Sequence, residues 1–352
     1  MSDLVKKNFI KDISEKENPY VIAEIGINHN GNMDLAREMI DAASENGADC
    51  VKFQNFIADK YISTHAGKAE YQKKNKLEKR SQHEIIKACE ITINQAKDLQ
   101  SYSKKKNIDF LSTPFELWSL SGLISIGVPA IKISSCNLTN IPFLEEAAKS
   151  KLPILLSSGM GTLNEVINAV SIFKKTNSPL MIFQCTSNYP SDPKNANLNV
   201  MKIYKKLFNI PVGLSDHTAS NTTSIAAVAL GAIAIEKHFT LSRDLPGIDQ
   251  KASMEPNELN ILVKQLKECK AALGSHIKHR TNEEESSAMA LRRSLIAATD
   301  LKVGELVKKD HIKIMRPGNG LMPEQLQIII GKRLTRSVKK GVPFSFDDFF
   351  SL

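Results

Sequence analysis

Short apolar runs alternate with longer segments of helical spacing along the first 240 residues. The apolar runs are residues 20–28, 50–56, 110–114, 130–135, 153–159, 180–187, 211–217 and 232–239. Apolar positions at helical spacing occupy segments between them, such as 32–46, 91–106, 163–175 and 222–230. Near-continuous apolar strands are typical of parallel strands buried on both faces. The pattern predicts eight strand–helix units.

Eight such units within roughly 250 residues are the usual make-up of a (β/α)8 TIM barrel. A doubly wound open sheet is the alternative, and it often carries a GxGxxG motif after its first strand. No such motif follows residues 20–28. We therefore predict an α/β fold of the barrel type.

The alternation ends near Leu273. Residues 274–288 are polar and charged, which indicates a linker, and the remaining chain contains short apolar runs, glycine turns and a helical stretch near 323–330. We predict a catalytic barrel over 1–275, a linker over 276–290 and a small β-rich domain over 291–352.

The composition, 42% hydrophobic and 24% charged residues, is that of a globular protein. No apolar run approaches the ~20 residues needed to span a bilayer, and the first residues lack the apolar core of a secretion signal. Five cysteines without a CxxC spacing favour reduced thiols. We expect a cytoplasmic protein without a membrane segment.

The formal net charge is +9, with basic clusters at residues 68–80 and 264–293. Nucleic-acid binding is one interpretation. The single Trp and the lack of a nucleic-acid-reading motif favour solvated faces instead. A basic protein also suits small anionic substrates.

Polar or ionisable residues stand at the end of nearly every predicted strand. They are Glu24, Asn28, Lys52, Gln54, Thr113, Lys132, Ser135, Ser157, Thr186, Ser187, residues 215–217 and residues 236–238. Burying such groups among Val, Ile and Leu is costly unless they meet partners or ligands. Because the functional groups of a parallel barrel gather at the C-terminal ends of its strands, the pattern predicts a site there.

Two histidines, His217 and His238, end successive predicted strands. Neighbouring strands lie ~4.8 Å apart, so both imidazoles can reach one ion. Two nitrogen ligands with open positions suit Mn²⁺, Co²⁺ or Zn²⁺ acting as a Lewis acid. We expect Asp216 and Glu236 to orient the imidazoles. The alternative is a pair of hydrogen-bonded core histidines.

Lys52 and Lys132 are two cations predicted to share the barrel mouth. One interpretation is a clamp for a small polyanion, with hydroxyl donors from Thr113, Ser135, Ser157 and Ser215. Ion pairing with Glu24 or Glu236 is the structural alternative. A lysine Schiff base, as in barrel aldolases, is a further one.

The other features are less specific. The segment Ser158-Gly159-Met160-Gly161 is compatible with a phosphate site at a helix N-terminus or with a tight turn. We expect Trp118 and the Phe residues of FDDFF to be packing groups. The histidines outside the two strand ends are predicted to lie at the surface: His29, His65, His83, His276, His279 and His311.

Seven segments of the chain resemble, in order, the sialic acid (N-acetylneuraminate) synthase family, which includes legionaminate and pseudaminate synthases. They are AEIGINHNGNMDLA, VKFQNF, LSTPFE, KISS, SSGMGT, GLSDHT and EKHFTLSRDLPGIDQKASMEP. The stretch RRSLIAATDLKVGE, with IMRPGNGL after it, is similar to the antifreeze-like (SAF) domain of that family.

The resemblance implies a TIM barrel followed by an antifreeze-like domain in a domain-swapped homodimer. It implies condensation of phosphoenolpyruvate with N-acetylmannosamine or a related 2-acetamido hexose, giving a sialic (nonulosonic) acid and phosphate. The implied cofactor is a divalent metal, Mn²⁺ foremost with Co²⁺ or Mg²⁺ as alternatives. No nucleic acid or membrane partner is expected.

Carried over by motif, the resemblance also assigns roles to residues. His217 and His238 would bind the metal, and Glu24, Lys52, Lys132 and Asp249 would be catalytic. Glu24 is a candidate for acid–base work. The substrates would contact Gln54, Thr113, Ser135, Asn137, Ser157, Ser187, Tyr189, Ser215 and, from the partner subunit's C-terminal domain, Arg316.

The sugar side leaves alternatives open. Asn137 replaces a carboxylate that many family members carry after KIGSG or KIPSG, so legionaminate or pseudaminate synthesis from a 2,4-diacetamido-dideoxy hexose is the main alternative. The basic segment 68–80 is as similar to legionaminate-type enzymes as to sialate ones. A Schiff-base aldolase and a carbohydrate- or ice-binding protein are the more distant alternatives.

Overall fold

The computed structural model describes residues 9–67 and 80–349 and divides into two compact units, Met1–Gly274 and Ser275–Leu352. The basic segment 68–80 falls outside the described residues except for Arg80.

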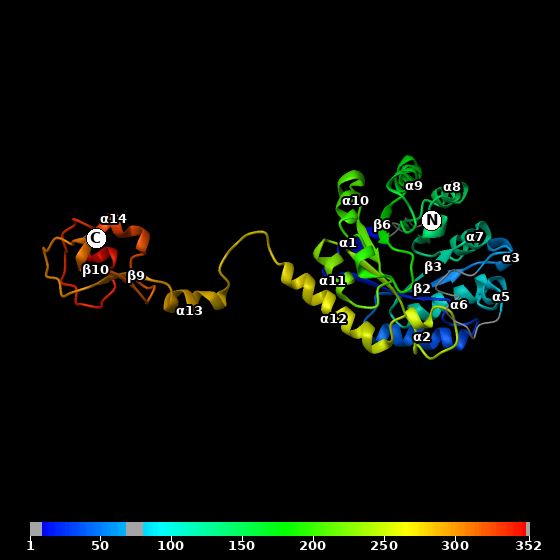
Figure 1. Ribbon diagram of the computed structural model, residues 1–352, viewed down its shortest axis with the longest axis horizontal. Coiled ribbons are helices and arrows are strands. Elements are labelled where there is room, and N and C mark those ends of the chain that lie inside the picture. Colours follow the sequence, from blue (N-terminus) through cyan, green and yellow to red (C-terminus); the bar gives the residue numbers. More distant parts are fainter. Residues whose placement is uncertain (1–8, 68–79, 350–352) are drawn as a thin grey trace, which may run out of the picture. The chain divides into compact units, whose positions relative to one another are not determined.

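The first unit is built on one sheet of eight parallel strands. They are β1 (Tyr20–Gly26), β2 (Cys50–Asn55), β3 (Asp109–Pro114), β4 (Ile131–Ile133), β5 (Ile154–Ser157), β6 (Leu180–Cys185), β7 (Val212–Ser215) and β8 (Ala234–His238). The hydrogen-bonded order is β3-β2-β1-β8-β7-β6-β5-β4, and the edge strands β3 and β4 are also in contact. The sheet therefore curls into a barrel with helices outside it (Figure 1), and the predicted (β/α)8 fold is confirmed.

Helices follow the strands around this barrel. They are α2 (Met33–Glu45), α3 (Ala58–Tyr61), α5 (Gln82–Ala88), α6 (Ile93–Lys105), α7 (Leu117–Ser125), α8 (Ile141–Lys149), α9 (Leu163–Lys175), α10 (Val200–Phe208), α11 (Thr222–Ala229) and α12 (Pro256–Leu273). Polar caps set several of their starts. Thr92 and Thr162 each form a capping box with the residue three positions later, which satisfies free amides of the first turn.

Side chains alternate between the two faces of the curled sheet, and this alternation creates two apolar layers. Outward residues such as Val51, Ile131 and Leu214 pack against the helices in the main core. Inward residues of most strands form a second cluster inside the barrel, which includes Ile22 of β1 and Leu111 of β3. The interior is thus a packed core at the N-terminal ends of the strands.

Helix α1 (Phe9–Ser14) belongs to this inner cluster. Phe9, Ile10 and Ile13 are buried against it, and the Phe9 ring meets Tyr20 edge-on at 5.7 Å. Tyr20 in turn donates a hydrogen bond to Asp109 (2.6 Å). The helix therefore covers the end of the barrel at which the strands begin, and the opposite end remains for chemistry.

Ile13→Ala is expected to lower the free energy of unfolding of the barrel unit by about 2–5 kcal/mol, because it removes a buried side chain and leaves a cavity. Urea denaturation measures the change. The exposed neighbour Asp12 supplies the control, since Asp12→Ala should alter stability by no more than about 0.5 kcal/mol. Equal effects of the two variants would contradict a plugging role for α1.

The second unit contains α13 (Asn282–Leu291), the antiparallel pair β9 (Ser294–Ala297) and β10 (Ile312–Met315), the short helix α14 (Leu326–Ile329) and three 3₁₀ turns. Leu295, Ile329, Phe344 and other apolar groups form its own core. The small second domain was predicted, but the predicted linker is partly helical. Thr281 forms a capping box with Glu284, and this local signal starts α13 inside the polar stretch.

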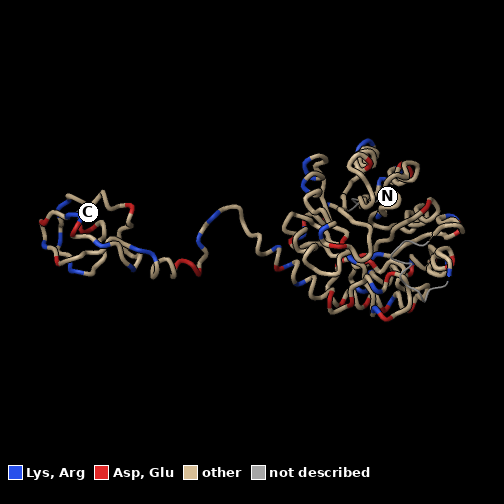
Figure 2. Tube along the Cα trace, in the orientation of Figure 1, with Lys and Arg blue, Asp and Glu red and all other residues tan. Residues whose placement is uncertain are grey.

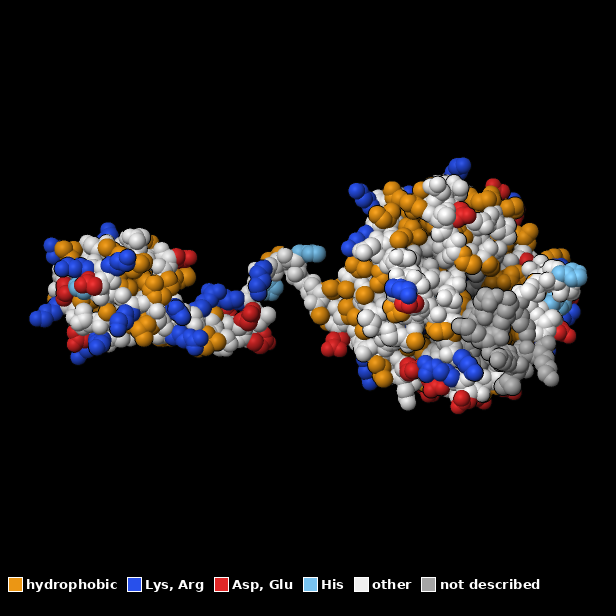
Figure 3. Space-filling model, in the orientation of Figure 1, with side chains coloured by type: hydrophobic (Ala, Val, Ile, Leu, Met, Phe, Trp, Pro, Cys, Tyr) orange, Lys and Arg blue, Asp and Glu red, His pale blue; other side chains and the backbone are white. Residues whose placement is uncertain are grey.

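No helix among residues 9–67 and 80–349 is both long and apolar enough to cross a bilayer. Figure 2 shows Lys and Arg interspersed with Asp and Glu along the trace, and Figure 3 shows the same mixture on the visible surface. In the basic cluster 264–293, Lys264, Lys267 and Arg293 are exposed, and α13 opens on three glutamates. This arrangement agrees with the solvated face expected from the sequence.

Candidate functional site at the C-terminal ends of the strands

A cavity of about 390 Å³ opens at the C-terminal end of the barrel. Of the residues predicted for the site, it is lined by Glu24, Lys52, Gln54, Thr113, Lys132, Ser135, Ser157, Ser187, Tyr189, Ser215, His217, His238 and Asp249. The two other predicted substrate contacts, Asn137 and Arg316, are not among its lining residues.

The side-chain alternation explains why these residues converge. On β1 the inward series runs from Tyr20 through Ile22 to Glu24, and on β2 it runs from Cys50 to Lys52. The backbone register places Glu24 beside both Lys52 and His238. Each strand thus buries apolar groups first and presents polar groups one or two steps later, at the level of the cavity.

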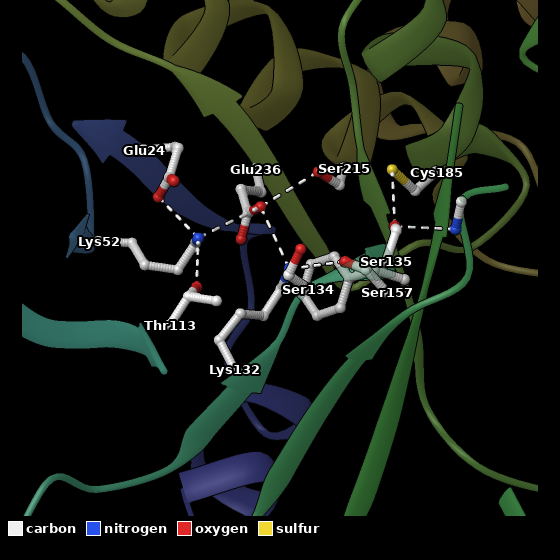
Figure 4. A network of polar contacts seen from close by, with 12 residues as sticks. Glu24, Lys52, Thr113, Lys132, Ser134, Ser135, Ser157, Cys185, Ser215 and Glu236 are labelled. Atoms are coloured by element: carbon white, nitrogen blue, oxygen red, sulfur yellow. Dashed lines mark hydrogen bonds and ion pairs between the residues drawn. The ribbon is translucent and has the colours of Figure 1, made fainter. Parts of the chain in front are cut away.

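Lys52 forms the first half of a buried polar network (Figure 4). Its ammonium lies 2.7 Å from Glu24 Oε2 and donates to Thr113 Oγ1 at 2.9 Å, with Glu236 Oε1 at 3.8 Å. Gln54 donates to the other oxygen of Glu24 (2.8 Å). Glu24 is therefore held between a cation and an amide.

Lys132 forms the second half. It donates to Ser157 Oγ at 2.6 Å and lies 3.3 Å from Glu236 Oε1, which also accepts from Ser215 (3.1 Å). Both lysines therefore share the Glu236 carboxylate. The ion-pairing interpretation of the lysines is confirmed, and it coexists with their position in the cavity wall.

Burial and charge set the protonation of this network. Burial lowers the pKa of Lys52, but Glu236 and Glu24 outweigh it and raise that pKa above its usual value. Burial raises the pKa of Glu24, whereas that of Glu236 is held below its usual range because the two lysines outweigh its burial. Burial lowers the pKa of Lys132. The network therefore mixes a firmly ionised carboxylate with one that takes up a proton more readily.

The histidine rings lie 5.4 Å apart, centroid to centroid. His217 Nδ1 is 2.9 Å from the carbonyl oxygen of Thr186, which only accepts hydrogen bonds, so Nδ1 carries a proton and Nε2 is left as the ligand atom of the neutral ring. The buried Nδ1 of His238 has no hydrogen-bond partner in the described part of the chain.

The two imidazoles fit a divalent ion. Burial, with a contribution from His217, lowers the pKa of His238 to about 3 and keeps this ring in its neutral, metal-binding form. Across residues 9–67 and 80–349, no third His, Cys, Asp or Glu joins them in a ligand cluster. Water or substrate oxygens would therefore complete the coordination of an ion held here.

Tyr189, Asp249 and Ser187 line the cavity beyond the histidines. The Tyr189 ring lies 4.2 Å from that of His217 and meets that of His238 edge-on at 5.5 Å. Burial, reinforced by the charge of Glu24, raises the pKa of Asp249 to about 6. These groups place hydrogen-bonding functions next to the candidate metal position.

Ser135 joins two strand ends. Its hydroxyl accepts from the Gly159 amide at 3.0 Å and lies 3.6 Å from Cys185 Sγ. A Cβ at Gly159 would approach the Ser187 and Ser135 hydroxyls to 2.3 and 2.7 Å, so only glycine fits here. In the segment Ser158-Gly159-Met160-Gly161, this close approach accounts for Gly159 without a phosphate.

Several groups of the cavity were not predicted, including Tyr61, Phe115, Cys136, Cys185 and Ile248. Cys185 was detectable, because it is the inward residue that ends β6. Burial raises its pKa, but His217 and other neighbours outweigh burial and bring it to about 7. Tyr61 ends the short helix α3 and Phe115 lies in the loop after β3, and the strand pattern defines the path of neither segment.

Asn137 does not line this cavity. Its amide donates to the Phe115 carbonyl (3.2 Å) and its oxygen accepts from Asn140 (3.1 Å), and both asparagines border a neighbouring groove. The cause is the 3₁₀ turn Ser135–Asn137, which directs the side chain away from the barrel axis. Arg316 is an exposed residue of the second unit, preceding a cis proline.

Asp216 and Glu236 do not form the direct contacts to the imidazoles that were expected of them. Glu236 pairs with the lysines, and Asp216 binds Lys237 on the outer side of the barrel. The carbonyl of Thr186 orients His217 instead. Strand alternation explains the error, because Asp216 is adjacent to His217 in sequence and therefore faces the other way.

Two further expectations need correction. His29 is not at the surface but fully buried against Phe53, and burial lowers its pKa to about 4. Trp118 is 67% exposed, with the Lys60 ammonium 3.7 Å from its ring centroid, and is not a core packing group. Of the FDDFF phenylalanines, Phe349 is buried, Phe346 is largely exposed and Phe350 lies outside the described residues.

Comparison with known proteins finds relatives along most of the chain. A model of the NeuB family matches residues 39–278, and a model of the SAF domain matches residues 292–349. N,N'-diacetyllegionaminic acid synthase of Legionella pneumophila is 39% identical over 96% of this chain and 96% of its own. The Campylobacter jejuni protein of that name is 40% identical over 91% of this chain and 97% of its own. Among solved structures, the N-acetylneuraminic acid synthetase of Leptospira borgpetersenii, in complex with citrate, is 37% identical and superposes with a TM-score of 0.69, covering 77% of this chain and 90% of its own.

Proposed function

This chain belongs to the NeuB family, and we propose from that premise that it condenses phosphoenolpyruvate with N-acetylmannosamine or a related 2-acetamido hexose. The products are a nonulosonic acid and inorganic phosphate. The observation that carries the proposal is one cavity in which two buried lysines adjoin two imidazoles. The lysines suit binding of a polyanion, and a divalent ion held by the imidazoles would suit a carbonyl compound.

The lysine side of the cavity is assigned to phosphoenolpyruvate. Lys52 and Lys132 supply charge, and the hydroxyls bonded to them, Thr113 and Ser157, with Ser215 nearby, can turn toward an anionic oxygen. Such charge-assisted hydrogen bonds are the strong ones in a buried site. Glu236 holds both ammonium groups in place before the anion arrives.

The histidine side is assigned to the divalent ion and the aldehyde. His217 and His238 would hold Mn²⁺, with Co²⁺ or Mg²⁺ as alternatives. A divalent ion bound there supplies Lewis-acid polarisation of a carbonyl oxygen. The methylene carbon of phosphoenolpyruvate then bonds to the aldehyde carbon, and the developing positive charge lies among Glu24, Glu236 and the bound phosphate.

Water completes the reaction at the central carbon of phosphoenolpyruvate. Its oxygen bonds to that carbon, and the carbon–oxygen bond to phosphate breaks to leave the keto acid. Of the two protons of the water, one goes to the former aldehyde oxygen and the other leaves with phosphate. Glu24 is assigned the transfer of one of these protons, because burial raises the pKa of its carboxyl and Gln54 and Lys52 hold it beside the cavity. Gln54, Ser187, Tyr189 and Asp249 are assigned to the hydroxyl groups of the sugar.

The SAF unit is assigned to a homodimer in which Arg316 reaches the cavity of the partner copy. Its guanidinium is exposed on a loop that follows β10, as a contact to an acyl group requires. We further assign the protein to the cytoplasm, where phosphoenolpyruvate is available. No disulfide joins its five cysteines, which suits a reducing compartment.

A phosphate-release assay tests the central proposal. The full-length protein, phosphoenolpyruvate and Mn²⁺ are incubated with N-acetylmannosamine, its 6-phosphate or a 2,4-diacetamido-dideoxy hexose. One aldose should give stoichiometric phosphate and a nonulosonic acid detectable by mass spectrometry. Phosphate release that never depends on an added aldose would overturn the proposal.

The diacetamido hexose is a specific second candidate for the sugar. The two relatives at 39–40% identity are named N,N'-diacetyllegionaminic acid synthases. Asn137 no longer distinguishes the candidates, since its side chain is used by Phe115 and Asn140. The ratio of kcat/KM between the two aldoses decides between them.

A further inference from the structure

Three consecutive residue pairs face each other at the ends of β7 and β8. The register pairs Ser215 with Glu236, and the next amide, that of Asp216, donates to the Glu236 carbonyl at 2.9 Å. Continuing this register brings Asp216 beside Lys237 and then His217 beside His238. The first and third pairs face the cavity, whereas the middle pair faces outward.

The middle pair is a buried ion pair. Asp216 and Lys237 are only 3% and 6% exposed, and Lys237 Nζ lies 3.1 Å from Asp216 Oδ2. Asp216 also accepts from the Ser224 hydroxyl (2.6 Å) and from the Thr218 amide (2.8 Å). Ser224 belongs to α11, so the carboxylate ties the strand end to the helix that covers it.

Lys237 extends the same connection past His217. Its ammonium donates to the carbonyl oxygens of Thr218 (2.7 Å) and Ser220 (3.2 Å). The backbone that follows His217 is therefore hydrogen-bonded both to the Asp216 carboxylate and to Lys237, the residue that precedes His238. The pair does not line the catalytic cavity, and Lys237 instead borders a separate cavity of about 460 Å³.

We infer that the Asp216–Lys237 ion pair is a positioning device that fixes His217 and His238 at the separation a divalent ion requires. The inference rests on the proposed function, because that function supplies the ion. A buried ion pair contributes little net stability compared with apolar groups of the same size. Its value here is geometric, since each partner immediately precedes one of the two histidines.

The neighbouring outward positions support this interpretation. On β7 and β8 they hold Val212, Leu214 and Ile235, all of which pack in the main core. Two charges therefore replace apolar groups only at the strand ends that carry the imidazoles. A purely structural core would continue the apolar series.

The test compares Mn²⁺ affinity with folding in four full-length proteins: the wild type, Asp216→Asn, Lys237→Met and the double variant. The double variant removes both charges, so no buried charge is left unpaired if a single variant folds poorly. Glu258→Gln is the matched control, since it breaks the ion pair of Glu258 with Arg243 (2.6 Å) beside the same outer cavity. Free Mn²⁺ is measured by electron paramagnetic resonance, and folding by circular dichroism and thermal denaturation.

We expect each single variant to bind Mn²⁺ about 10- to 100-fold more weakly, the usual loss when a group supporting metal ligands is removed. The double variant should lose no more Mn²⁺ affinity than the single variant with the larger loss, because both changes break the same ion pair. The KM for phosphoenolpyruvate should be unchanged, and Glu258→Gln should bind Mn²⁺ like the wild type.

Wild-type Mn²⁺ affinity in folded variants would overturn the positioning role and leave the proposed function intact. An equal rise in the KM for phosphoenolpyruvate would also overturn it, because general loosening of the barrel would then explain both losses. A wild-type protein that leaves all Mn²⁺ free would overturn the metal site itself, and the inference with it.

Discussion

Replacing either His217 or His238 with Ala is expected to reduce kcat/KM by about 10³-fold or more. A bound cation contributes several kcal/mol to polarising a carbonyl, and each 1.36 kcal/mol corresponds to a factor of ten in rate. The geometry argues that both rings are needed. His217 Nδ1 is committed to the Thr186 carbonyl, so its Nε2 faces the ligand, and the buried His238 is neutral.

The measurement is the aldose-dependent release of phosphate at saturating Mn²⁺, together with Mn²⁺ binding by each variant. His279→Ala is the control, since His279 is an exposed histidine of the second unit. Its activity should equal that of the wild type. Full activity of His217→Ala or His238→Ala in the presence of a chelator would remove the metal from the mechanism.

Much of the barrel was predictable because its strands are buried on both faces. Continuous apolar runs located all eight strands, and segments such as α9 and α11 were found within a residue of their ends. Strand ends were less accurate. Polar residues prolong the predicted runs, whereas β4 and β7 end at Ile133 and Ser215.

The cavity itself was predictable for the same reason. A lysine or glutamate buried in an apolar strand has to meet a partner. As expected, Lys52 pairs with Glu24 and Glu236, and Lys132 pairs with Glu236. Alternation also indicates the side to which a residue just past the strand points. Asp216 was assigned to the imidazoles from its place beside His217, although period two sends it outward.

Loop-dependent contacts were beyond the strand pattern. Asn137 was assigned to the sugar from its position after KISS, but a single 3₁₀ turn rotates its side chain into a groove shared with Asn140. His29 follows β1 in a polar segment and yet is fully buried, since the turn after Gly26 folds it back against Phe53. Such turns depend on tertiary contacts rather than on local hydrophobicity.

The second large effect is expected for Lys132→Ala. We expect kcat/KM for phosphoenolpyruvate to fall by about 10²- to 10³-fold, the loss typical of removing one preorganised charge-stabilising group from a buried site. Lys132 is the cation that links Ser157 to Glu236, at 2.6 and 3.3 Å. Its loss removes an anchor for the anion and leaves the Glu236 carboxylate with Lys52 alone, 3.8 Å away.

The two halves of the cavity predict different kinetics for this variant. The KM for phosphoenolpyruvate should rise while Mn²⁺ affinity stays near that of the wild type, the reverse of the histidine variants. Lys149→Ala, which removes an exposed lysine of α8, should leave both unchanged.

Borohydride treatment with pyruvate tests the remaining alternative, a lysine Schiff base. A Schiff-base enzyme would gain a covalent adduct that Lys132→Ala or Lys52→Ala abolishes, and such an adduct would contradict the assignment of these lysines to anion binding.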